Sequence, residues 1–308
     1  MKNNKVFMAF ASGKESTEAG VIKRYIGVAP SFVLAANPNK AKMSEVLDIT
    51  VEDEPNYVSE IDVNGTKVAN ARISFYLKPD PDKVGMDVNP INMALFIRDE
   101  YRYNKDKTKV QVIDKYGRTA WVTIAQAKQH EVPVYSNGPA KIDAGYRPAY
   151  VGEEELISFL KCYLNIPNVD VYNSKTGEWT TAANPSECEA SLENIPNYFK
   201  GDFTEIRNII ALQPKNKVKV LYGVRTTDEG KQYQAVFTHK FLKNNASNYS
   251  KLEQDVADRK AAGAYSTTEF EVCDFKEYVV ASTDLSTPTP ESSDLPFGDP
   301  SDSPWGNL

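Results

Sequence analysis

The chain has 308 residues, 41% of them hydrophobic and 11% aromatic, which is enough for one large folded domain or two ordinary ones. Its formal net charge of −6 argues against a nucleic-acid binder when taken alone. However, five of the 42 acidic residues follow Ser282, a region without Lys or Arg, which leaves 37 acidic against 36 basic residues elsewhere. The acidity is therefore mainly a property of the C-terminal tail.

Cysteine usage and hydropathy narrow the class of protein further. Cys162, Cys188 and Cys273 lie far apart and form no CxxC pair, so neither a disulfide framework nor a zinc cluster is indicated. The first 16 residues contain no apolar run of the length of a signal peptide, and no apolar stretch reaches about 18 residues. We therefore expect a cytoplasmic protein that does not enter the membrane.

The first elements along the chain are a strand and a helix. The apolar run 31–36 predicts a buried strand. In "NPNKAKMSEVLD", Asn37 is expected to cap a short helix that has Pro38 at its first position. Residues 45–62 then carry seven acids and no base, a pattern typical of a solvated acidic face.

Three hairpins are indicated by alternating strands around turn residues. The first turns at Asn64–Gly65, the second at residues 115–117, and the third, within 217–242, near Asp228–Gly230. Between the first two, "PINMALFIRDEYRY" starts as an apolar strand. We expect Leu95 and Ile97 to point into the core, with Tyr101 and Tyr103 on the same face if the strand continues unbroken.

Helical periodicity replaces strand alternation in the second half of the chain. Residues 152–165 place apolar side chains at i, i+3, i+4, i+7 and i+8, with acids in the first turn. A shorter helix is expected at 203–210, a further helix at 249–262 and a last strand at 266–275. From Ser282 the chain is rich in Ser, Thr, Pro and Asp, which predicts a disordered acidic tail. The fold class is thus mainly β with inserted helices (α+β).

Motifs for catalysis fail when they are checked. "SGKES" at 12–16 lacks the first glycine and the Ser or Thr of a phosphate-binding loop, and the two histidines, His130 and His239, are too far apart to indicate a metal site. We expect no cofactor and no metal. A nuclease or other metal-dependent enzyme built from scattered carboxylates stays open as an alternative.

Two segments combine bases with aromatic residues. Residues 98–128 contain eight bases and four acids, and residues 215–243 contain seven bases and two acids, each interleaved with Tyr, Phe or Trp. Proteins that hold single-stranded nucleic acid use such sets, because Lys and Arg follow the phosphates while aromatic faces stack on bases of any sequence. The alternative is that these rings belong to the core and that the bases keep a sheet soluble.

The tail contains a motif of its own. "DLPF" at 294–297 closely resembles the tip of the acidic tails of bacterial single-stranded DNA-binding proteins, and "DSPWGNL" looks like a variation on it. Such tails recruit replication and repair partners. The chain departs from them because eleven residues follow Phe297, so that the terminal Phe carboxylate is absent.

Blocks of the body also resemble a known family. "YIGVAPSFVLAANPNKAKM" (25–43), "VIDKYGRTAWV" (112–122) and "YRPAYVGEEELISFLKCYLNIP" (146–167) are similar to bacteriophage single-stranded DNA-binding proteins. The resemblance implies an OB-like antiparallel β-barrel over residues 1–281 that coats single strands during phage DNA replication, recombination or repair, in the cytoplasm of an infected bacterium. Residues 282–308 would form the tail.

The expected function is sequence-independent binding of single-stranded DNA without enzymatic activity. A non-enzymatic virion or accessory component that uses its sheet for protein contacts is the alternative. The residues expected to bind nucleic acid are Arg98, Tyr101, Arg102, Tyr103, Lys105, Lys107, Lys109, Tyr116, Arg118, Trp121, Arg225, Lys231 and Tyr233. The residues expected to dock on replication or recombination proteins are Asp294, Leu295, Phe297, Asp302 and Trp305.

Overall fold

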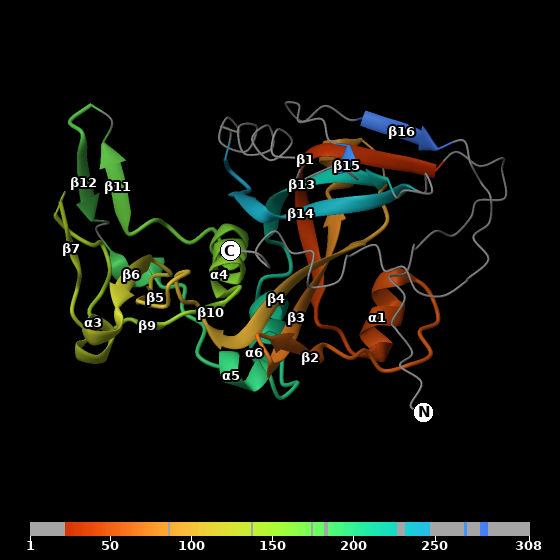
Figure 1. The fold of residues 1–308 in the computed structure, drawn as a ribbon. Helices are drawn as coiled ribbons and strands as arrows, with labels where there is room; N and C mark the ends of the chain where they lie inside the picture. The colour runs from red at the N-terminus through yellow and green to blue at the C-terminus, as the bar shows by residue number, and fades with distance from the viewer. Residues whose placement is uncertain are drawn as a thin grey trace.

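The computed structural model describes residues 22–85, 87–136, 138–173, 175–181, 184–226, 232–246, 268–269 and 278–282. They form two parts that lie side by side (Figure 1). The body contains a nine-stranded sheet with helices α1, α2, α4, α5 and α6, and the small lobe contains residues 102–149 together with the hairpin β11–β12. The predicted helix at 249–262 and the tail residues Asp294, Leu295, Phe297, Asp302 and Trp305 lie outside the described residues.

The bounds of the elements are as follows. The strands of the body are β1 (Ile22–Ala36), β2 (Val58–Val63), β3 (Thr66–Pro79), β4 (Ile91–Tyr101), β10 (Tyr150–Val151), β13 (Lys217–Thr226), β14 (Gln232–Lys243), β15 (Thr268–Glu269) and β16 (Tyr278–Ser282). Its helices are α1 (Lys40–Leu47), α2 (Pro81–Val84), α4 (Glu153–Tyr163), the 3₁₀ turn Pro185–Cys188, α5 (Ile195–Tyr198) and α6 (Thr204–Leu212). The small lobe has β5 (Lys109–Ile113), β6 (Thr119–Thr123), α3 (Ile124–Gln129), β7 (Val134–Tyr135), β8 (Gly138–Pro139), β9 (Arg147–Pro148), β11 (Asp170–Asn173) and β12 (Glu178–Thr181).

The strands of the body are joined in the order β10-β4-β3-β1-β13-β14, with β2 added to β3, β15 to β13 and β16 to β1. The described ladders are antiparallel, as the hairpin signals in the sequence predict. Strand β4, which lies next to β10 at one end of this path, contacts β14 at the other end, although no ladder joins them among the described strands. The structure therefore confirms a mainly β fold with antiparallel sheets and a few helices, and it contains no closed barrel in its described part.

Local signals explain several of these elements. Asn64 and Gly65 both have positive φ, 52° and 83°, so that Val63 pairs with Thr66 across a two-residue turn. Helix α1 begins two residues later than predicted, because Asn39, not Asn37, accepts the cap hydrogen bond from the Lys42 backbone amide at 2.9 Å. Asn37 is instead buried and bonds the edge of β3, where its Oδ1 accepts from the Ser74 amide at 2.7 Å.

Helix α4 covers the core of the body with the apolar stripe that the sequence predicts. Phe159 lies between Phe75 of β3 and Phe241 of β14, with ring centroids 4.2 Å and 5.1 Å away. The three acidic residues of its first turn complement the helix dipole. Because β4, β13 and β14 all contact α4, this helix packs across the sheet where its two ends approach each other.

The small lobe has a separate and smaller core. It is formed by Val110, Val112, Ala120, Val122, Ile142 and Tyr146. A bulge connects it to the body, since β10 pairs Tyr150 with Tyr101 but Val151 with Arg98. Gly152 follows with φ 87°, and a Cβ there would meet the Phe96 carbonyl oxygen at 1.8 Å, so glycine is required at this junction. No helix in the described part of the chain is long and apolar enough to cross a membrane.

Candidate nucleic-acid interface

Strand β4 presents an aromatic ring and a base on the face opposite the core. Leu95 and Ile97 are buried, as predicted, so the intervening Phe96 points outward and is 41% exposed. Arg98 follows on the same outer face, where it pairs opposite Asn70, while Phe96 pairs opposite Arg72. This face of β4 therefore combines a ring with a base, although Asn70 and Ser74 of β3, which share it, are buried.

Tyr101 and Tyr103 keep the inward parity of Leu95 and Ile97, but they lie beyond the edge of the core. Each is 41% exposed. Tyr101 packs on Tyr150, with ring centroids 5.1 Å apart, and Tyr103 forms a bridge to Val110 of the small lobe. Burial, and then the neighbouring Tyr101, raises the pKa of Tyr150 to about 12. The rings stay accessible because β4 leaves the body at the bulge and enters the lobe.

Arg102 is held in a polar network at the same junction. Its Nη1 donates to Glu154 Oε2 at 2.7 Å and to Gln111 Oε1 at 3.0 Å. Gln111 donates in turn to Glu154 Oε2 at 3.0 Å, and the guanidinium lies 5.9 Å from the ring of Trp121. Arg102 thus fixes Trp121 and α4 in place, and its charge is largely balanced by Glu154.

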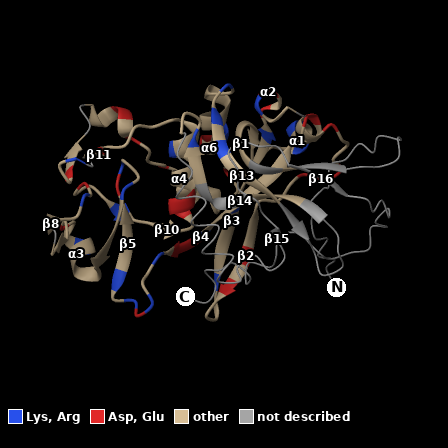
Figure 2. Ribbon diagram, turned by 90° about the horizontal axis from the view of Figure 1, so that it is seen from above, with Lys and Arg blue, Asp and Glu red and all other residues tan. Residues whose placement is uncertain are grey.

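The lysines at 105, 107 and 109 occupy an ordered turn between β4 and β5. Asn104 holds the turn, since its Oδ1 accepts from the Lys109 amide at 2.7 Å and its Nδ2 donates to Thr108 Oγ1 at 3.1 Å. Hydrogen bonds from Thr108 lower the pKa of Asp106 within the same turn. All three lysines are exposed, and Figure 2 shows basic residues along this turn and at the start of β5.

Tyr116 and Arg118 form a second group at the other end of the β5–β6 hairpin. The Arg118 guanidinium lies 4.8 Å from the Tyr116 ring. Its Nε donates to Asp114 Oδ2 at 2.8 Å, and its Nη1 lies 3.6 Å from Asp170 Oδ2. Both carboxylates are mostly or fully shielded from solvent, so Arg118 links the β5–β6 turn to the hairpin β11–β12.

The remaining predicted residues belong to the body or are not described. Arg225 pairs opposite Tyr233 in the β13–β14 ladder. Lys231 lies outside the described residues. The predicted set therefore divides between the β4 end with its lysine turn, the far end of the β5–β6 hairpin, and strands β13–β14.

Three residues that belong with these groups escape the sequence analysis. Phe96 stands beside Arg98 on β4, and Trp179 of β12 lies 4.9 Å from the Lys141 ammonium. A signal for the hairpin exists, because "DVYN" and "EWTT" flank the turn residues Ser-Lys-Thr-Gly. Phe96 is harder to predict, since the sequence does not show on which face of an apolar strand a single aromatic ring lies.

Within the described part of the chain, four buried polar atoms on the Phe96 face of β3–β4 have no hydrogen-bond partner. They are Asn70 Oδ1, Arg72 Nε, Ser74 Oγ and Asn92 Oδ1. Each buried polar atom without a partner costs about 1–3 kcal/mol. This row is therefore a local weakness in the described part of the sheet.

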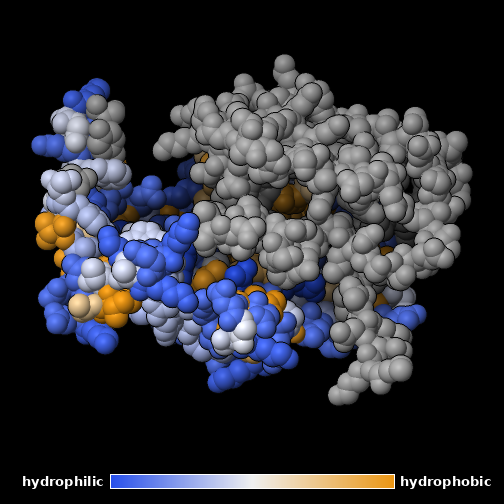
Figure 3. Space-filling model, in the orientation of Figure 1, coloured by the Kyte–Doolittle hydropathy of each residue, from blue (hydrophilic) through white to orange (hydrophobic). Residues whose placement is uncertain are grey.

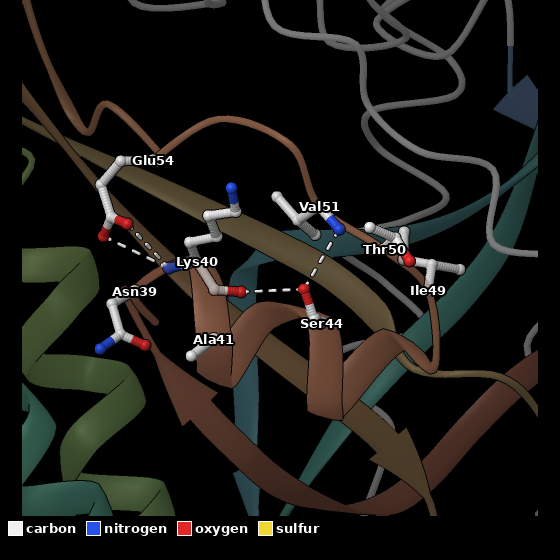
Figure 4. A pocket seen from close by; sticks show the side chains of 8 residues that line it. All are labelled: Asn39, Lys40, Ala41, Ser44, Ile49, Thr50, Val51 and Glu54. Atoms are coloured by element: carbon white, nitrogen blue, oxygen red, sulfur yellow. Dashed lines mark hydrogen bonds between the residues drawn. The ribbon is translucent and has the colours of Figure 1, made fainter.

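The acidic segment 45–62 divides between two places, since residues 45–57 lie in or beside α1 and residues 58–62 belong to β2, which pairs with β3 (Figure 1). A shallow pocket of about 540 Å³ opens beside α1, where Glu54 accepts from the Lys40 backbone amide and Ser44 Oγ accepts from the Val51 amide at 3.1 Å (Figure 4). At the N-terminus of α1, the backbone amides of Lys40 and Lys42 already donate to Glu54 and Asn39. These two amides are therefore not available to bind a phosphate. The visible face of the small lobe is mostly hydrophilic, with small hydrophobic patches (Figure 3).

Within the described ranges, no three His, Cys, Asp or Glu side chains gather as ligands for a metal ion. No family model, curated protein or solved structure matches the chain.

Proposed function

We propose that the protein binds single-stranded DNA without sequence preference and without catalysing a reaction, in phage DNA replication, recombination or repair. The observation that carries this proposal is the path along β4, where the half-exposed rings of Tyr101 and Tyr103 lead into three exposed lysines, while Phe96 and Arg98 precede them on the other face of the strand. Rings that are half exposed can stack on bases, and unshielded ammonium groups can follow phosphates.

The strand order supports an OB-like reading of the body. Numbered in chain order, the five long strands β1, β3, β4, β13 and β14 neighbour one another as 3-2-1-4-5, and the contact of the third with the fifth brings the ends together. An OB fold is a partly open five-stranded barrel that binds oligonucleotides on its second and third strands. In this chain those strands are β3 and β4, and the proposed path begins on β4.

The resemblance of the body and tail to phage and bacterial single-stranded DNA-binding proteins supports the biological setting. Under this proposal the acidic tail, including Leu295, Phe297 and Trp305, recruits replication or recombination proteins. The rival proposal, a virion or accessory component, predicts a stable protein complex and no affinity for DNA.

The decisive test measures the affinity for labelled oligo(dT) as a function of salt. Replacing Lys105, Lys107 and Lys109 together by Gln should reduce the slope of log K against log salt by about 2, since each phosphate contact contributes about 0.7 for single strands. The matched control replaces Lys40, Lys42 and Lys83 on the α1–α2 side of the body, which removes the same charge.

Equal effects of the two triple variants would show that only net charge matters and would contradict the β4 path. Absence of any oligo(dT) binding by the wild-type protein would refute the proposed function. Turnover of DNA that requires Mg²⁺ would favour the nuclease alternative.

A further inference from the structure

The hairpin β11–β12 is a two-stranded ribbon that stands at one end of the small lobe (Figure 1). The described side chains on both of its faces are exposed beyond Asp170; Val171 on one face is 53% exposed and Trp179 on the other is 55% exposed. An isolated two-stranded hairpin is marginally stable in water. Its position therefore has to be fixed at its base.

Asp170 supplies this anchor. Its two carboxylate oxygens lie 3.6 Å from Arg118 Nη1 and 3.7 Å from Lys141 Nζ. Arg118 is itself fixed by the fully buried Asp114. The base of the hairpin is consequently tied to the β5–β6 turn, so the ring of Trp179 is presented at a defined place on the lobe.

Trp179 lies on the same face of the hairpin as Asp170, since Tyr172 pairs opposite Trp179 and Asp170 opposite Thr181. The Lys141 ammonium is 4.9 Å from the centre of the Trp179 ring, and the Lys141 side chain is 44% exposed. The exposed indole can stack on a base, and the exposed ammonium beside it can contact a phosphate of the same or the next nucleotide. Asp170 leaves Lys141 partly available, because it shares its charge with Arg118.

We propose that Trp179 and Lys141 form a second contact point for single-stranded nucleic acid, separate from the path along β4; this inference rests on the proposed function. The two places are separated by the length of the β5–β6 hairpin, because Lys109 pairs with Thr123 at one end and Ile113 with Thr119 at the other. Four residue steps span about 13 Å. A strand that occupies the β4 end must therefore extend along the lobe to reach Trp179.

This geometry makes the contribution of Trp179 depend on oligonucleotide length. We expect Trp179→Ala to weaken binding of the longest oligo(dT) about tenfold and to leave the shortest unchanged, over a series from about four to about sixteen nucleotides. Trp179→Phe should retain most of the affinity, because a phenyl ring still stacks. Lys141→Gln should reduce the salt slope for long oligonucleotides by about 0.7.

The measurement is fluorescence anisotropy of labelled oligo(dT) with the full-length chain, accompanied by thermal unfolding of each variant. Val171→Ala is the matched control, since it changes the opposite face of the same hairpin and should leave affinity unchanged at every length.

The outcomes separate the two proposals. If the wild-type protein binds oligo(dT) but Trp179→Ala binds every length equally well, the second contact point is refuted while the proposed function stands. A loss that is equal for short and long oligonucleotides, or that is shared by Val171→Ala, also refutes it. If the wild-type protein binds no oligo(dT), the proposed function fails and this inference fails with it.

Discussion

The body and the small lobe use the same kinds of aromatic residue in opposite ways. In the body, Phe75, Phe159 and Phe241 pack against one another and are buried. At the edge of the lobe, Tyr103 and Trp179 are about half exposed. Exceptions exist on both sides, since Phe96 of the body is exposed and Tyr146 of the lobe is buried.

The difference comes from what covers each sheet. Helix α4 packs across the strands of the body and closes over its rings, whereas the lobe has a three-stranded sheet with a core made largely of Val and Ala. A small sheet buries few large side chains, so rings at its margin remain at the surface. We infer that the rings of the body supply stability and that the rings of the lobe are available for binding.

The largest expected effect tests this division directly. Phe159→Ala should lower the free energy of unfolding by about 3–5 kcal/mol, because it removes a buried ring and leaves a cavity between β3 and β14. Tyr103→Ala should change it by less than about 0.5 kcal/mol, since that ring is at the surface. Urea unfolding of both variants measures the contrast. Similar losses would mean that the ring of Tyr103 is structural after all.

The connection between the two parts is the next target. Glu153 is fully buried and accepts hydrogen bonds from Arg147 Nη1 at 2.9 Å and from the Tyr150 amide at 3.0 Å, while Arg147 Nη2 also donates to the Leu192 carbonyl at 3.1 Å. Glu153→Gln keeps the shape but removes the charge that balances Arg147. We expect a loss of about 2–3 kcal/mol, at the lower end because Arg147 is partly exposed.

Hydrogen exchange shows where the loss occurs. Protection in β5 and β6 should fall more than protection in β3 if the ion pair joins the lobe to the body. Glu189→Gln is the control, because Glu189 is exposed and lies 3.9 Å from Lys115. A uniform loss across both parts would contradict a joint at Glu153.

The sequence predicts those features of the fold that local chemistry determines. Asn64–Gly65 predicts the β2–β3 hairpin because both residues adopt positive φ readily. The apolar spacing in α4 predicts which face of that helix is buried. The two other hairpins follow from the same alternation. The cap of α1 is misplaced by two residues because Asn37 and Asn39 have the same chemistry, and only the tertiary contact with β3 distinguishes them.

The candidate site is predicted less well, because its charges are balanced by residues far away in the chain. Arg102 pairs with Glu154, and Arg118 with Asp170. Each partner is about fifty residues distant, so neither pair is visible as a local pattern. The lysines at 105, 107 and 109, which the sequence analysis expects to bind nucleic acid, are exposed because they lie in or beside a turn that Asn104 and Thr108 hold.

The smallest effect that we expect compares two serines of the body, both fully buried. Ser31 Oγ lies 2.7 Å from the buried hydroxyl of Tyr222, whereas Ser74 Oγ has no hydrogen-bond partner among the residues that the structure describes. Substitution by Ala removes the same atom in both cases, so the terms for transfer and cavity are similar. Ser31→Ala should cost about 1–2 kcal/mol, because it leaves the Tyr222 hydroxyl unpaired, and Ser74→Ala should change stability by less than about 0.5 kcal/mol.

Thermal and urea unfolding of the two variants measure this difference. The change leaves the hydrogen bonds of the Ser74 backbone in place, since its amide donates to Asn37 Oδ1 and its carbonyl accepts from the Asn37 amide, so the side-chain hydroxyl is the one variable. A cost for Ser74→Ala as large as that for Ser31→Ala would show that Ser74 Oγ is satisfied in solution, for example by a bound water. The polar row on β3–β4 would then be a hydrated seam and not a weakness of the sheet, and the stability of the body would depend on more than its aromatic core.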